Sequence, residues 1–174
     1  MVTPGPSFSK YKIPVFWNDE FKNLNYIREE FNDKESLKKW KKMGYGPKVT
    51  GAMCDMRSVQ PSWNKSFIKI FSEMGWKDVG TSYYRMDTGT VMPVHSDLYL
   101  KYVGLFGLQG KEHRIRRAVL FLEDWKSGHY SEVAGHPIVN WTAGQFIEWN
   151  YDTPHSAANL GEEDRYTLQI TGHV

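Results

Sequence analysis

RIRRAVLFL, residues 114–122, is the stretch that decides the fold. Its second half is an unbroken apolar run, which is typical of a strand with a buried face. Side chains alternate across a strand, so Arg117 shares a face with Val119 and Phe121, and Arg116 takes the opposite face. The sequence does not decide which face looks inward. Either arginine is therefore a candidate for the interior, where it could meet the carboxylate of a substrate.

Short strands are expected on both sides of this segment, because runs rich in Thr, Tyr and apolar residues alternate with Gly- and Asp-containing turns. The expected strands cover residues 79–86, 91–95, 114–122, 130–133, 137–141, 145–149 and 165–171. Many short strands at close spacing predict two packed sheets of the jelly-roll type. The predicted fold class is therefore mainly β, with helices at the N-terminus.

The part of the chain before residue 79 has apolar residues at helical spacing. Three helices are expected there, at residues 16–31, 33–43 and 61–74, the first of them capped by Asn18 or Asp19. Residues 1–13 are expected to form a loose arm, residues 48–57 no regular element, and residues 98–110 either a helix or a packed loop. No linker is visible. We expect one domain over 1–174, with a helical layer (1–78) on a jelly-roll core (79–174).

Composition limits the function classes. Hydrophobic residues make up 40% of the chain and charged residues 24%, which is typical of a globular protein. The net charge of +2 gives no case for nucleic-acid binding, and the lysine-rich stretch 38–42 is better explained as a solvated helix face. No apolar run approaches the roughly 18 residues that span a bilayer. Because Cys54 is the single cysteine and no signal-peptide core is visible, we expect a cytoplasmic protein.

Two histidines and one aspartate are the candidate metal ligands. His95 and Asp97 are two positions apart at a predicted strand, so both can project to the same side, and His155 could come from a neighbouring strand. Two imidazoles and one carboxylate can occupy one face of an octahedral Fe(II) and leave three positions open. Taken alone, His95 and Asp97 are equally consistent with a turn at a strand end.

A second pair of residues follows at the start of the last predicted strand, where Arg165 and Thr167 share a face. An arginine that points into a core requires an anion, and a guanidinium binds a carboxylate through two parallel hydrogen bonds. A neighbouring hydroxyl can add one more donor. The alternative is a surface arginine paired with Glu162, Glu163 or Asp164.

Together, His95-x-Asp97, His155 and Arg165-x-Thr167 resemble the iron(II)/2-oxoglutarate-dependent oxygenases. The stretch 155–170 looks most like the prolyl and aspartyl/asparaginyl hydroxylase branches, and the chain is also similar to small oxygenases of the bacteriophage type. The resemblance covers residues 79–174. It departs from the aspartyl hydroxylase branch proper, which often lacks the metal carboxylate that Asp97 supplies here.

The resemblance implies a double-stranded β-helix, the cupin-like jelly roll, with Fe(II) held by His95, Asp97 and His155. Arg165 and Thr167 would hold the distal carboxylate of 2-oxoglutarate. It also implies a tyrosine on the preceding strand as a cosubstrate ligand, with Tyr84 a better match than Tyr83. The implied reaction uses molecular oxygen, releases succinate and CO2, and hydroxylates an aliphatic carbon of a peptide side chain or small molecule.

Two other readings remain open. A cupin-type metal enzyme that does not use 2-oxoglutarate would keep the metal ligands, but it would need no carboxylate clamp at Arg165 and Thr167. A non-catalytic jelly-roll binding module would need neither the metal ligands nor the carboxylate clamp. Iron binding that depends on His95 and His155 distinguishes the metal enzymes from the binding module.

Overall fold

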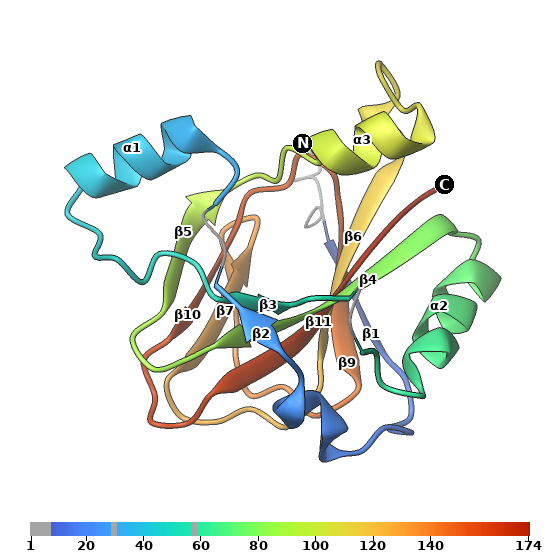
Figure 1. The fold of residues 1–174 in the computed structure, drawn as a ribbon, viewed down its shortest axis with the longest axis horizontal. Coiled ribbons are helices and arrows are strands. Elements are labelled where there is room, and N and C mark those ends of the chain that lie inside the picture. The colour runs from blue at the N-terminus through green and yellow to red at the C-terminus, as the bar shows by residue number, and fades with distance from the viewer. Residues whose placement is uncertain (1–7, 29–30, 57–58) are drawn as a thin grey trace, which may run out of the picture.

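The computed structural model describes residues 8–28, 31–56 and 59–174. Within these ranges the strands form a seven-stranded sheet, in the order β1-β9-β6-β11-β4-β3-β2, and a four-stranded sheet, in the order β5-β10-β7-β8. Every pairing is antiparallel. The seven-stranded sheet is called the larger sheet below, and the four-stranded sheet the smaller sheet. Figure 1 shows the smaller sheet on one side of the molecule, with α1 and α3 above the two sheets.

The element bounds are as follows. The strands of the larger sheet are β1 (Phe8–Lys12), β9 (Gln145–Asn150), β6 (Ile115–Phe121), β11 (Arg165–His173), β4 (Lys77–Met86), β3 (Ala52–Cys54) and β2 (Tyr26–Ile27). Those of the smaller sheet are β5 (Val91–His95), β10 (His155–Asn159), β7 (His129–Val133) and β8 (His136–Ile138). The helices are α1 (Lys34–Lys42), α2 (Asn64–Glu73) and α3 (Leu100–Phe106), with short 3-10 helices at Asp19–Asn23 and Glu112–Arg114.

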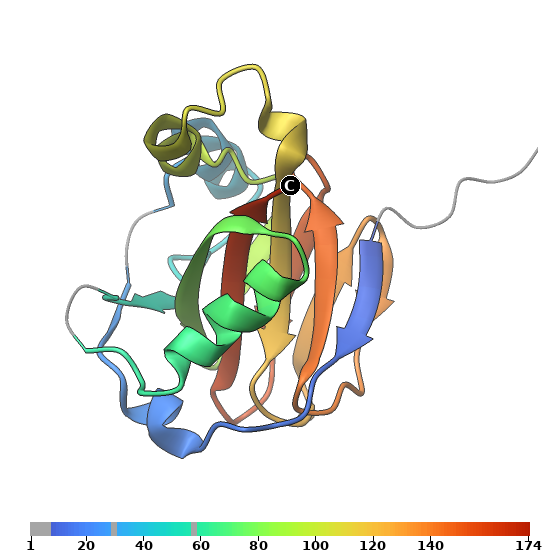
Figure 2. The same cartoon turned by 90° about the vertical axis from the view of Figure 1, so that its right-hand side faces the viewer.

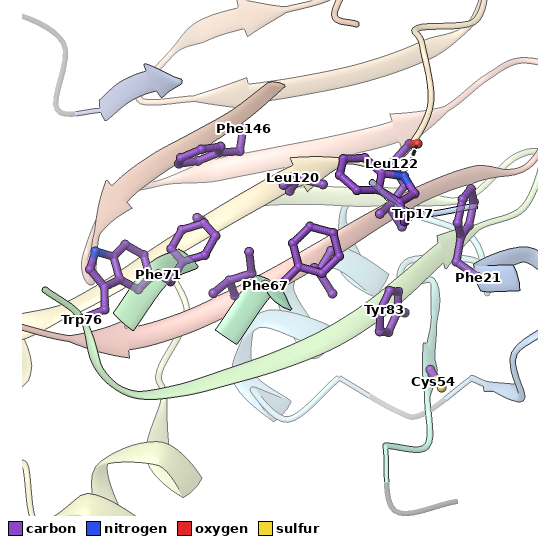
Figure 3. Close-up of a cluster of buried hydrophobic side chains, with 13 residues drawn as sticks. Trp17, Phe21, Cys54, Phe67, Phe71, Trp76, Tyr83, Leu120, Leu122 and Phe146 are labelled. Carbon is purple, nitrogen blue, oxygen red and sulfur yellow. Dashed lines mark hydrogen bonds between the residues drawn. The ribbon is translucent and has the colours of Figure 1, made fainter. Parts of the chain in front are cut away.

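The outer face of the larger sheet is covered by α2 (Figure 2). Phe67 and Phe71, one helical turn apart on α2, are fully buried there, and the Phe71 ring lies 5.2 Å from that of Phe146 on β9. Figure 3 shows these rings and Leu120 of β6 gathered in one apolar cluster. Full burial of each such side chain is worth about 1.5–3 kcal/mol, so this cluster stabilises the packing of α2 on the larger sheet.

β11 lies between β6 and β4 in the larger sheet. Its side chains alternate between the two faces of that sheet. Leu168 and Ile170 belong to the apolar cluster under α2. Arg165 and Thr167 point to the opposite face, toward the smaller sheet, and line a cavity there. One strand therefore serves the core with one set of positions and the cavity with the other.

A second apolar cluster joins the two sheets. It combines residues of β6 and β9 with residues of β7, β8 and the β8–β9 connection: Phe121, Ile147, Trp149, Val133, Ile138 and Trp141. Within it, the rings of Phe121 and Trp141 stack with their centroids 4.0 Å apart. The two sheets therefore pack face to face, as expected for a jelly roll.

Two predicted helices are confirmed with small changes at their ends. Asp33 caps α1, since its side chain accepts hydrogen bonds from the backbone N–H groups of Glu35 and Ser36. Gly44 and Gly75 follow α1 and α2 in the left-handed region, with φ of +91° and +93°. The ambiguous stretch 98–110 contains α3. None of the described helices is long and apolar enough to cross a membrane.

Three expectations for the N-terminal part are wrong. In place of the predicted helix 16–31 there are a short 3-10 helix and β2, although Asn18 does cap the 3-10 helix by accepting the N–H of Glu20; residues 29–30 lie outside the described residues. The expected loose arm 1–13 contains β1, which pairs with β9; residues 1–7 lie outside the described residues. The stretch 48–57, expected to be irregular, contains β3. In each case pairing with a distant strand outweighs the local pattern.

Candidate metal centre and its cavity

The three predicted metal ligands meet at one end of the smaller sheet. His95 is the last residue of β5 and His155 the first of β10, and the two are direct partners in the register of this pair. Ligand atoms of His95, Asp97 and His155 all lie within 4.8 Å of one another. Asp97 Oδ1 is 3.5 Å from His95 Nε2, and Asp97 Oδ2 is 3.8 Å from His155 Nε2. Such a group can hold a metal ion.

Backbone carbonyls fix the orientation of both imidazoles. His95 Nδ1 lies 2.7 Å from the carbonyl oxygen of Pro93, and His155 Nδ1 lies 3.0 Å from that of Thr153. A carbonyl can only accept, so each Nδ1 carries the proton and donates it. In the neutral ring this leaves the lone pair on Nε2, which faces Asp97. Hydrogen bonds of this kind, made by the ring nitrogen that does not bind the metal, orient metal-binding histidines.

The ionisation states suit a metal site. Burial lowers the pKa of His155 to about 4, against the opposing effect of Asp97. Burial also acts to raise the pKa of Asp97, but the charge of Arg117 and the two imidazoles outweigh it and hold that pKa well below its ordinary value. At neutral pH the site therefore offers a neutral imidazole from His155 and a carboxylate from Asp97, which are the forms that bind metal.

Aromatic rings surround the two histidines. Phe31 and Trp40, the latter on α1, lie with their ring centroids 5.1 and 5.8 Å from that of His95. Trp149 of β9 lies 4.8 Å from His155. These rings limit the access of water to the imidazoles. Trp40 is also the buried residue of α1, so the position of this helix depends on the same contacts.

At the start of β11, Arg165 is buried with 3% of its surface exposed. Its polar partners among the described residues are neutral: Nη1 lies 3.3 Å from the Met86 sulfur, and Nη2 donates to the Ser131 hydroxyl. Its Nε has no hydrogen-bond partner in the described part of the chain. The guanidinium also lies over the rings of Trp141 and Phe121, at 5.4 and 5.9 Å. Burial lowers the pKa of Arg165 to about 10.

Thr167 and Tyr84 lie beside Arg165 on the same face of the larger sheet. They are direct partners in the β11–β4 pair. The Tyr84 hydroxyl accepts the backbone N–H of Gly51 at 2.6 Å. Tyr83 points the other way, into the apolar cluster, where its hydroxyl donates to Asn64. The structure therefore brings Tyr84, and not Tyr83, to the side of Arg165.

Arg117, and not Arg116, is the arginine of β6 that faces the interior between the sheets. Its Nε and Nη2 donate to Oδ2 of Asp97 at 3.1 and 2.9 Å, and its Nη1 donates to the Thr171 hydroxyl at 2.7 Å. Arg116 instead donates to the backbone carbonyl of His113. The partner of Arg117 in the structure is thus a carboxylate of the chain itself.

One cavity of about 210 Å³ between the sheets contains both groups of residues. At one end it is lined by the three candidate ligands and Arg117, and at the other by Arg165, Thr167 and Tyr84. The candidate metal ligands and the buried guanidinium of Arg165 therefore line the same cavity.

Several residues of this cavity escaped the sequence analysis. Ser131 and Met86 contact Arg165 but stand in ordinary strand patterns. Gly51 carried a signal, because a glycine beside a strand often marks a close approach of another group. A Cβ at Gly51 would lie 2.7 Å from Cζ of Tyr84 and 2.4 Å from the Arg85 carbonyl oxygen, so only glycine fits under Tyr84.

Comparison with known proteins supports the fold. No family model matches the chain, and no curated protein matches its sequence. A prolyl-4-hydroxylase of Pseudomonas putida superposes with a TM-score of 0.59 at 13% identity, over 97% of this chain and 93% of that one.

Weaker structural likeness extends to cupin proteins. A cupin protein of Bacteroides fragilis gives a TM-score of 0.40 at 13% identity, over 60% of this chain and 74% of that one. A Klebsiella pneumoniae protein with a double-stranded β-helix domain gives 0.38 at 12% identity, over 55% and 68%. The sheet topology described above and the Pseudomonas structure together confirm the predicted fold class, a mainly β, cupin-like jelly roll.

Proposed function

We propose that this chain is an Fe(II)- and 2-oxoglutarate-dependent oxygenase, with a single domain over 1–174. It hydroxylates an aliphatic carbon of a peptide side chain or small molecule, consumes molecular oxygen, and releases succinate and CO2. The observation that carries the proposal is Arg165, a buried cation whose polar partners among the described residues are neutral, in the same cavity as a group of two histidines and an aspartate.

The donor set fits Fe(II). His95, Asp97 and His155 supply two imidazoles and one carboxylate, which is the facial set of non-haem Fe(II) oxygenases. Bound iron would supply the oxidative chemistry of the reaction, at coordination positions that the three side chains leave free. The residues of the chain hold the metal, orient the imidazoles through carbonyl contacts and keep water away with the surrounding aromatic rings.

The other end of the cavity fits a carboxylate. A buried guanidinium without an anionic partner is costly, and a ligand carboxylate bound to Arg165 would remove that cost through charge-assisted hydrogen bonds. Thr167 offers a hydroxyl beside it. The Tyr84 hydroxyl already accepts from Gly51, so its own proton can be donated to the ligand. A dicarboxylate such as 2-oxoglutarate can use Arg165 at one end and the metal at the other.

The fold match adds support of a general kind, because the Pseudomonas protein of the same fold is described as a prolyl-4-hydroxylase. A cupin-type metal enzyme that does not use 2-oxoglutarate would leave the charge of Arg165 without a function. A binding module would leave both the ligand set and Arg165 without one. We therefore favour the oxygenase over both.

The test is an anaerobic titration of the metal-free protein with Fe(II) and then with 2-oxoglutarate. The quantity measured is the absorbance of the visible metal-to-ligand charge-transfer band. We expect a band in the wild type, none in His95→Ala, and a large increase in the 2-oxoglutarate concentration required in Arg165→Met. Arg116→Met is the matched control and should behave as the wild type. Iron binding without a band would favour the cupin-type enzyme, and no iron binding would favour the binding module.

If the band forms, succinate release provides the assay for a substrate screen. Candidate peptides and small molecules are added to the Fe(II)- and 2-oxoglutarate-loaded protein in air. A true substrate should increase succinate release above the uncoupled background and gain one oxygen atom by mass spectrometry.

A further inference from the structure

Arg117 and Asp97 form a two-point contact in which both donors reach the same oxygen. Nε and Nη2 of Arg117 lie 3.1 and 2.9 Å from Oδ2 of Asp97. The other oxygen, Oδ1, lies on the side of His95, 3.5 Å from its Nε2. Both oxygens border a candidate metal ligand, since Oδ2 lies 3.8 Å from His155 Nε2. They differ in that both N–H donors of Arg117 reach Oδ2 and neither reaches Oδ1.

Arg117 is itself held from two further directions. Its Nη1 donates to the Thr171 hydroxyl at 2.7 Å, from the neighbouring strand β11. The ring of Tyr99 lies with its centroid 5.2 Å from Cζ of Arg117, within cation–π range. Tyr99 takes the left-handed backbone conformation, with φ of +51°, which is unfavourable for a residue of its size. A side chain fixed at this many points can define the position of the carboxylate that it contacts.

A carboxylate can bind a metal through one oxygen or through both, and the number decides how many coordination positions remain. With two N–H donors on Oδ2, Asp97 can offer Oδ1 alone. Three protein ligands then occupy three of the coordination positions of an octahedral ion, and the other three stay open. If Asp97 bound through both oxygens, a chelating cosubstrate and a further ligand could no longer be accommodated together.

We propose that Arg117 is a positioning residue that fixes Asp97 as a one-oxygen metal ligand. This inference rests on the proposed function, since it assumes that the site binds a metal. It assigns Arg117 a role different from contact with a substrate carboxylate.

Arg117 could influence metal affinity through its charge or through its positioning of Asp97, and the two influences have opposite signs. The guanidinium is a positive charge beside a cation site, and like charges repel. If the charge of Arg117 were its only influence, Arg117→Lys would keep that repulsion and leave metal affinity unchanged, and Arg117→Gln would increase it. If Arg117 acts by positioning, Arg117→Lys should weaken metal binding, because lysine carries the charge but cannot place two N–H donors from a planar group on one oxygen.

The experiment uses Mn(II), a redox-stable probe, with the full chain. The dissociation constant is measured from free Mn(II) by electron paramagnetic resonance, and the number of bound waters from water-proton relaxation. We expect Arg117→Lys to weaken Mn(II) binding about 10- to 100-fold, the usual range for lost second-layer contacts, and to carry fewer waters than the wild type. Arg116→Lys, next along β6 and facing away from Asp97, should match the wild type in both readouts.

The outcomes separate this inference from the proposed function. No Mn(II) binding by the wild type would overturn the metal site itself. Binding by the wild type with unchanged affinity and water number in Arg117→Lys would overturn only the positioning role. If circular dichroism shows that Arg117→Lys does not fold, Thr171→Val takes its place: it keeps Arg117 but removes one of its anchors, and the same two readouts decide.

Discussion

Two arginines reach the cavity from the adjacent strands β6 and β11, and they meet different partners. Burial acts to lower the pKa of Arg117, but the Asp97 carboxylate outweighs it and raises that pKa above its ordinary value. Burial lowers the pKa of Arg165 to about 10, and no carboxylate of the described residues offsets it. The chain itself thus satisfies the charge of Arg117, whereas in the proposed function a ligand carboxylate satisfies that of Arg165.

The largest expected effect follows from removing the satisfied arginine. Arg117→Met leaves the Asp97 carboxylate buried without its cation, and breaking a buried pair in this way costs about 3–5 kcal/mol. We expect the metal-free protein to lose about that much free energy of unfolding, measured by urea denaturation. A variant as stable as the wild type would mean that Asp97 does not depend on Arg117, and the contrast between the two arginines would fail.

Ligand-induced stabilisation tests the other arginine. A ligand present at 100 times its dissociation constant stabilises the folded protein by about 2.7 kcal/mol. We expect 2-oxoglutarate, added to the Mn(II)-loaded wild type, to raise the melting temperature accordingly, and to have no such effect on Arg165→Met. Arg116→Met should respond as the wild type. An equal shift in Arg165→Met would show that the ligand does not use this guanidinium.

Without ligand, Arg165→Met should change stability in the opposite direction from Arg117→Met. Methionine fills a similar volume and removes a buried charge that has no anionic partner in the part of the chain that the structure describes. We therefore expect a gain of about 1–2 kcal/mol in the free energy of unfolding. The measurement is the same urea denaturation. A clear loss of stability would mean that the contacts with Trp141, Phe121 and Ser131 outweigh the cost of burying the charge.

The smallest effect belongs to an ionic cluster outside the cavity, formed by Asp87 with Arg28 and Lys48, which serves as a reference. Burial acts to raise the pKa of Asp87, but the Thr90 hydroxyl, Lys48 and Arg28 outweigh it and hold that pKa below its ordinary value of 3.8. A carboxyl group whose pKa is lower in the folded than in the unfolded state stabilises the fold at pH values above the unfolded-state pKa. This contribution is lost as the pH falls from the unfolded-state pKa through the folded-state pKa.

Asp87→Asn should therefore be less stable than the wild type near pH 6, by up to about 1 kcal/mol for such a partly exposed pair. The difference should shrink as the pH falls below 3.8, where the unfolded chain takes up its proton. Thermal melts of both proteins between pH 2 and pH 6 measure it. A difference that does not depend on pH would assign the effect of Asp87 to its hydrogen bonds and not to its charge.

Most of the strands, and the closeness of His95 to Asp97, could be predicted from sequence because their signals are local. Strand propensity marks β4, β5 and β6, and His95 and Asp97 are neighbours along the chain. The choice between Arg116 and Arg117, or between Tyr83 and Tyr84, could not be made, because it depends on which face of a sheet is covered. That is decided by α2 and by the smaller sheet, which are distant in sequence.

The helix expected at residues 16–31 failed for a related reason. Phe21 does lie in the core, 1% exposed, and Leu24 packs against the same apolar cluster. Phe16 and Ile27, in contrast, are exposed at 40% and 39%. The backbone here is a short 3-10 helix and the two-residue strand β2. Apolar spacing predicts burial and does not by itself select the backbone conformation. β1 was missed because its partner, β9, is far along the chain, and most of its residues are exposed.

The alternation along β11 also bears on how such a protein could change its specificity. Arg165 and Thr167 face the cavity, while Leu168 and Ile170 pack under α2. In the proposed function, substitutions at the first set would change ligand recognition with the core intact. An insertion or deletion of one residue within β11 would exchange the two sets, sending the arginine into the apolar cluster. This strand should thus accept exchanges of residues at its cavity positions while rejecting changes in its length.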